Sequence, residues 1–186
     1  MKTFLAATLL FFLASIAAGQ KSSDAINKLI NSLHADKQIK LTYDNGSKLS
    51  KVMAIADNFS DSEAKAAGLQ AMNFGMAFFF NGNALSESPV TINFTFWAMA
   101  KKPRFVADGH WIATIGGDSL DLGPFRYGPK PSENMEYLNF VLNRDDLARI
   151  AASPSPVKFK LGNYDFTFTA SQMTLLKNII AVSDLK

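Results

Sequence analysis

The chain has 186 residues, of which 19 are Lys or Arg and 16 are Asp or Glu, and it contains no cysteine. The absence of thiols excludes disulfides, cysteine nucleophiles, iron–sulfur clusters and thiolate zinc sites. The small net charge of +3 and the lack of a long basic run predict that nucleic acid is not a partner.

The amino-terminal segment has the layout of a secretory signal peptide. Lys2 provides a positive charge, Phe4 to Ala14 form an unbroken run of apolar and small residues, and small residues continue to Gly19. This run is shorter than the roughly 20 apolar residues that a membrane-spanning helix needs. We predict that residues 1–19 are cleaved on export, with an uncleaved anchor as the alternative. The mature protein is then secreted or periplasmic and has no transmembrane segment.

The remaining residues, 20–186, have the length of a single globular domain with its own core. The whole chain contains 16 Phe, 2 Trp and 4 Tyr, which supply large apolar side chains for that core. Because no disulfide is available, we expect packing of these side chains to stabilise the domain.

Helical and strand periodicities alternate along the domain. Helices are indicated where a capping residue precedes apolar residues spaced three or four apart, and strands where apolar residues alternate. Asn-Gly, Asp-Gly and Gly-Asn pairs between strands are typical of tight hairpins. The predicted elements are a helix at 22–35, strands at 38–43 and 49–56, a short helix at 60–67, strands at 72–80, 90–98, 105–107, 110–115 and 135–142, a helix at 144–152, strands at 157–161 and 164–168, and a helix at 170–182.

This order of elements predicts the fold class. No strand–helix–strand unit repeats along the chain, so a parallel sheet is not indicated. We therefore predict an α+β fold, a mostly antiparallel β-sheet or sandwich with N-terminal, mid-chain and C-terminal helices packed against it.

The segment 118–135 contains Gly123-Pro124, Gly128-Pro129 and Pro131, which predict a long loop. Long loops in compact domains are uncommon unless they are functional or mobile. We therefore expect residues 116–135 to contact a partner or ligand.

Few residues indicate a metal or catalytic site. The two histidines, His34 and His110, are too far apart in sequence for a short-spaced metal pair, although Asp108 lies close enough to contact His110. Asp118 and Asp121 offer oxygen ligands for calcium, but their spacing matches no known calcium loop. We predict no metal and no cofactor.

An enzyme is the alternative reading rather than the leading one. Ser62 and Lys65 have the Ser-x-x-Lys spacing of some hydrolases, but the companion motifs are missing and the pair lies in a helix-start sequence. A small exported hydrolase with a carboxylate, Asp/His or Ser/Lys site stays open.

Binding has more support from the aromatic residues. Trp97 lies on the polar face of the strand that follows Pro89, and several aromatic residues lie in or beside the turn-rich segment. Such side chains stack on sugar rings or apolar ligands when exposed, although the alternative for Trp97 is a second core face. The leading hypothesis is an exported, non-enzymatic domain that binds a small ligand or a protein, with a carrier of an apolar ligand as another alternative. The candidate binding residues are Trp97, Trp111, Phe125, Arg126 and Tyr127.

Overall fold

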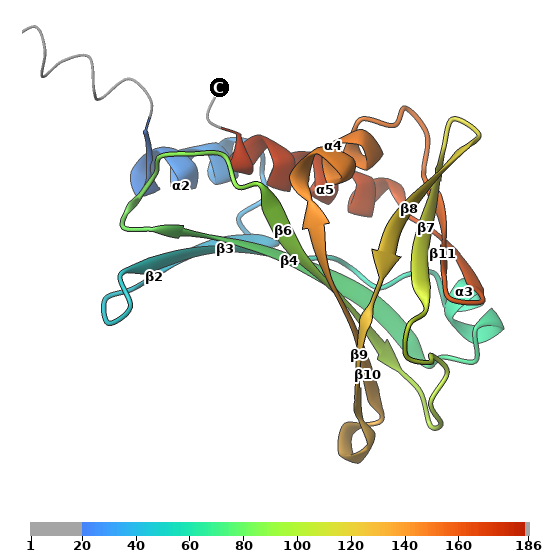
Figure 1. Cartoon of the computed structure of the whole chain (residues 1–186). Helices are drawn as coiled ribbons and strands as arrows, with labels where there is room; N and C mark the ends of the chain where they lie inside the picture. The colour runs from blue at the N-terminus through green and yellow to red at the C-terminus, as the bar shows by residue number, and fades with distance from the viewer. Residues whose placement is uncertain (1–19, 185–186) are drawn as a thin grey trace, which may run out of the picture.

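A computed structural model describes residues 20–184, so the predicted signal peptide at 1–19 lies outside the described residues. The described part has twelve strands, which pair antiparallel in three sheets, and four α-helices (Figure 1), so the predicted α+β class is confirmed. The helices are α2 (Ser23–Ser32), α3 (Asp61–Ala66), α4 (Arg144–Ala151) and α5 (Ala170–Ser183), with a 3-10 turn η2 (Pro131–Glu133). The strands are β1 (Lys21–Ser22), β2 (Ile39–Asp44), β3 (Leu49–Ile55), β4 (Ala71–Asn81), β5 (Ala84–Leu85), β6 (Thr91–Met99), β7 (His110–Ile115), β8 (Asp118–Pro124), β9 (Arg126–Lys130), β10 (Met135–Asn143), β11 (Lys158–Leu161) and β12 (Tyr164–Thr167).

The large sheet has six strands in the order β2-β3-β4-β6-β10-β9. Alternation along its central strands puts Phe74 of β4 opposite Phe96 of β6, and both are fully buried. Figure 1 shows α2, α4 and α5 on the same side of this sheet. Of the helices in the described part, none has the length and apolar character to cross a membrane.

Side-chain caps fix the starts of these helices. Ser22 accepts a hydrogen bond from the Ala25 N–H at the start of α2, and Asn143 accepts one from the Asp145 N–H at the start of α4. The helix α5 begins with a capping box, in which Thr169 and Gln172 bond to each other's backbone N–H groups. These starts agree with the capping sequences, and the predicted elements at 22–35, 144–152 and 170–182 are present with small shifts at their ends.

The small sheet has four strands in the order β12-β11-β7-β8. Its last strand, β8, is followed after one residue, Phe125, by β9, which belongs to the large sheet. The predicted long loop at 118–135 is therefore wrong, because this segment forms two strands and the η2 turn. Proline does not forbid these strands: Pro124 ends β8, and Pro129 lies on an edge strand, where one missing N–H is tolerated.

The predicted strand at 105–107 is also wrong. These residues form no ladder, and the backbone N–H groups of Arg104 and Phe105 instead donate hydrogen bonds to the Glu136 carboxylate at 3.0 Å. Since this segment has no strand pairing, Asp108-Gly109 is not a hairpin turn between two strands. Asp108 adopts a left-handed conformation with φ of 63°.

The core lies between the large sheet, the small sheet and the inner faces of α2, α4 and α5, and it is rich in phenylalanine. Phe59, from the segment that precedes α3, is 3% exposed and inserts between the sheets. Its ring centroid lies 5.7–6.2 Å from those of Phe74, Phe96, Phe159, Phe166 and Phe168. These rings pack against one another and join the large sheet to the small one.

Candidate ligand-binding face

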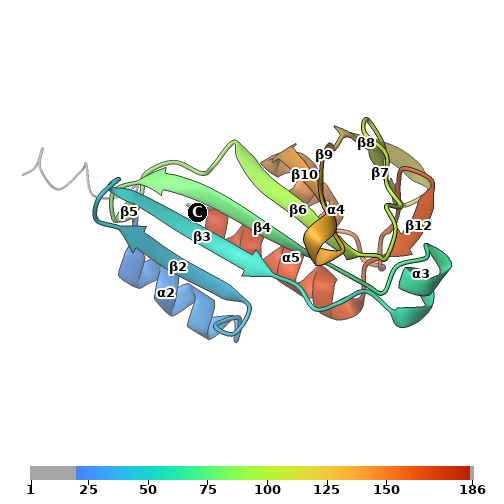
Figure 2. The same ribbon diagram turned by 90° about the horizontal axis from the view of Figure 1, so that it is seen from below.

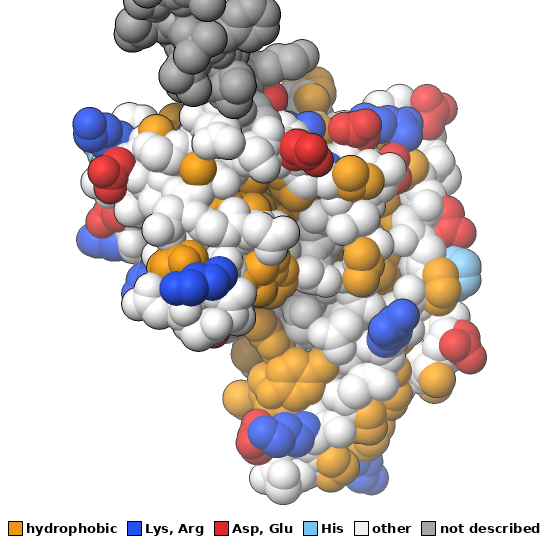
Figure 3. Space-filling view, turned by 60° about the vertical axis from the view of Figure 1, so that its left-hand side comes forward, with side chains coloured by type: hydrophobic (Ala, Val, Ile, Leu, Met, Phe, Trp, Pro, Cys, Tyr) orange, Lys and Arg blue, Asp and Glu red, His pale blue; other side chains and the backbone are white. Residues whose placement is uncertain are grey.

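One face of the large sheet carries no helix. Seen from below in Figure 2, β2, β3, β4 and β6 lie in front of α2 and α5. We call this surface the open face. It is hollowed, with hydrophobic side chains gathered below the hollow (Figure 3). By strand alternation, its central residues are Lys51, Met53, Ile55, Asn73, Gly75, Ala77, Phe79, Asn93, Thr95, Trp97, Met99, Tyr137, Asn139, Val141 and Arg126.

Trp97 is half-buried at the centre of the open face, on the side of β6 opposite the core residues Phe94 and Phe96. Its indole lies over Gly75 of the neighbouring strand β4. A Cβ atom added at Gly75 would lie 2.4 Å from Cη2 of the indole, closer than two carbon atoms can approach. Glycine at position 75 is therefore what allows the ring to lie against the sheet.

A cavity of about 140 Å³ adjoins this indole. Gly75 contributes only backbone to it and Ala77 only a methyl group, while Trp97 and Met53 contribute larger apolar side chains. The polar groups at the cavity come from Lys51, Asn93 and Thr95. An apolar surface bordered by a few polar groups is the usual make-up of a small-molecule site.

Some amide and hydroxyl groups of the open face form hydrogen bonds with one another, and others form none within the described residues. Thr95 Oγ1 donates to Asn139 Oδ1 at 2.9 Å, and Asn139 Nδ2 donates to the Arg126 carbonyl at 3.4 Å. By contrast, the side chains of Asn73 and Asn93 form no hydrogen bond within residues 20–184. Each free amide offers both donors and an acceptor to a ligand.

Two of the predicted binding residues are core residues instead. Trp111 is 0% exposed, with its ring centroid 4.7 Å from that of Phe94, and Phe125 is 3% exposed. Phe125 packs against Gly109, where an added Cβ would lie 2.4 Å from the ring. Both were expected at the surface because they border a predicted loop, but strand alternation and the sheet-to-sheet connection turn them inward.

The other two predicted residues lie on β9 with different environments. Arg126 is exposed at the edge of the open face. Tyr127 is partly buried, and its hydroxyl donates to Glu136 Oε1 at 2.8 Å. Burial, together with this hydrogen bond to Glu136, raises the pKa of Tyr127 to about 12. Tyr127 is therefore tied to a structural contact, and Arg126 is available to a ligand.

The sequence missed Gly75, Lys51 and Asn93 as site residues. A glycine inside an otherwise regular strand was the available signal for Gly75, because it marks close approach of another group. Lys51 and Asn93 carried no such signal, since only the strand order β3-β4-β6 brings them to the same cavity.

A second polar cluster involves His110, but with a different partner from the predicted one. His110 Nδ1 lies 3.0 Å from both carboxylate oxygens of Asp121, rather than from Asp108. The pKa of Asp121 is lowered, first by the hydrogen bond that its carboxylate accepts from the Gly123 N–H and second by its hydrogen bond with His110. These side chains are 46% and 55% exposed. A cavity of about 290 Å³ lies next to His110, between residues 104–110 and 162–164.

The residues considered for a calcium site or a Ser/Lys hydrolase site do not form such a site in the described part of the structure. No group of three His, Asp or Glu side chains that could hold a metal occurs within the described residues, so Asp118 and Asp121 are not part of a calcium cluster there. Ser62 lies in the first turn of α3 beside the capping residue Ser60, at 3.3 Å between their hydroxyl oxygens. This placement agrees with a helix-start role for the Ser-x-x-Lys sequence.

Comparisons of the chain with protein-family models, with curated proteins and with solved structures found no match in any of the three. The fold and the site therefore define only a class: an α+β protein of antiparallel sheets, with helices on one face of the large sheet and a hollowed, aromatic and amide-rich surface on the other.

Proposed function

We propose that this protein is an exported carbohydrate-binding protein, and that it holds a sugar chain on the open face. The observation that carries the proposal is the half-buried Trp97 indole, which lies over Gly75 next to a small cavity with unbonded polar groups. An aromatic ring fixed on a rigid sheet offers a flat apolar surface, which suits the apolar face of a pyranose ring.

The distribution of polar groups across the strands favours sugars over a flat protein partner. Each central row of the ladder, once extended to β3, combines an apolar side chain with an amide or hydroxyl, because Met53 of β3 pairs with Ala77 and Ile55 of β3 pairs with Gly75. The rows are Ala77, Asn93 and Val141; Gly75, Thr95 and Asn139; and Asn73, Trp97 and Tyr137. A sugar ring has apolar faces and a rim of hydroxyls, so it matches this alternation. The buried centre of a protein interface is typically more continuous in its apolar contacts.

The hydrolase alternative has weaker support. His110 and Asp121 have the orientation of a base and its carboxylate partner, but no hydroxyl in residues 20–184 is hydrogen-bonded to His110. Both side chains are also largely exposed, so the site does not exclude water. We therefore place the function at the open face.

Titration calorimetry with soluble neutral and acidic hexasaccharides tests this proposal. Trp97→Ala should lower the affinity for the best hexasaccharide by at least about tenfold, equivalent to about 1.4 kcal/mol. Val106→Ala is the control, because Val106 is an apolar side chain that is 68% exposed outside the open face. Its affinity should stay close to that of the wild-type protein. Absence of hexasaccharide binding, or equal binding by the Trp97→Ala variant, would refute the proposal.

A further inference from the structure

The open face is positively charged. Its strand positions carry Lys40, Lys51, Arg126 and Lys130, against one acid, Asp44. The Asp44 carboxylate is occupied within its own turn, where it accepts hydrogen bonds from the Gly46 N–H and the Ser47 hydroxyl, each at 2.8 Å. Asp44 is the last residue of β2, so its negative charge lies at one end of the open face and not at its centre.

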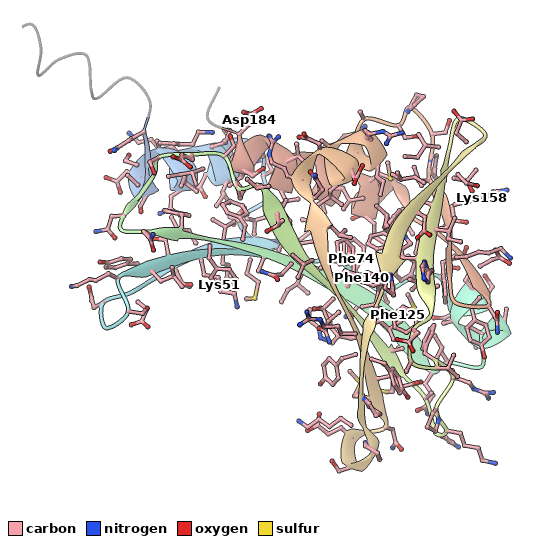
Figure 4. All side chains as sticks on the ribbon, in the orientation of Figure 1. Lys51, Phe74, Phe125, Phe140, Lys158 and Asp184 are labelled. Carbon is pink, nitrogen blue, oxygen red and sulfur yellow. The ribbon has the colours of Figure 1, made fainter. Side chains whose placement is uncertain are left out.

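The cations on this face differ in their partners. Lys130 forms an ion pair with Glu133. Lys51 and Arg126 form no ion pair within residues 20–184, and the Lys51 ammonium lies 5.8 Å from the centroid of the Phe79 ring. In Figure 4, the Lys51 side chain lies on the side of the sheet away from the helices. Lys40 forms no ion pair within residues 20–184 either, so three cations on the open face are available to an anionic ligand, and Lys51 and Arg126 are the two that lie on either side of Trp97 in the strand order.

Their positions flank the proposed sugar site. Lys51 lines the cavity beside Trp97. Arg126 is paired with Asn139 at the β9 edge, and Asn139 is bonded to Thr95 of the same cavity. Strands β3 and β9 are four positions apart in the sheet, which corresponds to about 19 Å at roughly 4.8 Å per strand. This width accommodates several sugar rings between the two cations.

We infer that the bound carbohydrate is an acidic polysaccharide whose sugars carry carboxylates, an inference that rests on the proposed function. The Arg126 guanidinium has the planar fork that binds a carboxylate through two hydrogen bonds, and Lys51 provides a compact charge beside the stacking ring. Two well-separated cations suit carboxylates on different sugars. Nucleic-acid sites instead concentrate basic side chains along successive phosphates, and this face has no such cluster.

Calorimetry with a galacturonate hexamer and a neutral glucose hexamer tests the inference. At about 50 mM salt the uronate should bind at least about tenfold more tightly, and the difference should shrink at high salt because exposed charges are screened. Lys51→Gln and Arg126→Gln should each weaken uronate binding at least about threefold, and should weaken binding of the neutral hexamer by a clearly smaller factor.

Lys158→Gln is the matched control, because it removes the same charge from β11 of the small sheet, on the other side of the molecule (Figure 4). It should bind both hexamers as the wild-type protein does. Trp97-dependent binding with no preference for uronate would overturn this inference and leave the proposed function standing. If neither hexamer binds, both fail. Tighter binding of a thymidylate hexamer than of the uronate would overturn the inference in favour of nucleic acid.

Discussion

The Tyr127 hydroxyl donates a hydrogen bond to the Glu136 carboxylate, which is 3% exposed and also accepts the backbone N–H groups of Arg104 and Phe105. A buried carboxylate is stabilised when donors surround it. Here the donors come from β9 and from the segment after β6. Glu136 therefore fixes an irregular segment that has no strand pairing of its own.

Replacing Glu136 with Gln should destabilise the fold by about 2 kcal/mol, because the amide nitrogen cannot accept the N–H groups that the carboxylate accepts. Urea unfolding at neutral pH measures this change. Glu133→Gln is the control: it removes an acid from an exposed ion pair with Lys130, and such solvent-screened pairs contribute little to stability. Equal losses in the two variants would show that Glu136 does not hold this segment.

Tyr127 should make stability depend on pH in the alkaline range. Folding raises the pKa of Tyr127 from 10.0 to about 12, because burial and the Glu136 contact favour the neutral phenol. Its contribution to the free energy of unfolding is therefore complete below pH 10 and is lost as the pH rises from 10 to about 12. The stability difference between the wild-type protein and Tyr127→Phe, measured by urea unfolding, should shrink across this range. A difference that stays constant would contradict the assignment.

Phe59 should be among the most costly residues to truncate, because it contacts rings from both sheets. Phe59→Ala should lower the free energy of unfolding by about 3–5 kcal/mol. Phe79→Ala removes the same side chain from the open face, where it is 43% exposed, and should cost about 1 kcal/mol or less. If Phe59→Ala does not fold, Phe59→Leu should still lower the urea midpoint more than Phe79→Ala. The reverse order would mean that Phe59 is not a central core residue.

Local patterns predicted most elements of this fold, because alternation and capping are properties of short segments. The strand that contains Trp97 and the helix capped by Asn143 are examples. The segment 118–135 failed because glycine and proline signal turns locally, whereas its strands form through pairing with β7 and β10. Strand alternation could have placed Trp111 in the core, since Ala113 shares its face. Lys51 and Trp97 line the same cavity only because β3, β4 and β6 are neighbours in the sheet, and a local sequence pattern does not predict the order of strands.

The two tryptophans should differ in their access to solvent. Trp97 is half-buried on the open face, whereas Trp111 is fully buried among phenylalanines. In a Trp111→Phe variant, acrylamide should quench the emission of Trp97 efficiently. In a Trp97→Phe variant, the emission of Trp111 should be shielded. Binding of a hexasaccharide should protect only Trp97 from the quencher. Similar quenching of the two variants would mean that the open face is covered in solution.

Gly75→Ala provides a test of the site that removes no ligand-facing functional group and changes only the position of the Trp97 ring. The new methyl group would meet the Trp97 indole at 2.4 Å, so the ring must move away from the sheet. Alanine is also easier to order in a strand than glycine by roughly 0.5–1 kcal/mol, which offsets part of the strain and keeps the protein folded.

The affinity of Gly75→Ala for the hexasaccharide should therefore fall about as far as that of Trp97→Ala, by at least about tenfold. Gly128→Ala is the matched control, because Gly128 lies on β9 of the same face and an added Cβ would make only ordinary contacts of 3.7 Å or more. In the Trp97→Ala background, Gly75→Ala should add no further loss, since the ring that it displaces is already absent. A Gly75→Ala protein with wild-type affinity would show that the position of the Trp97 ring does not determine binding.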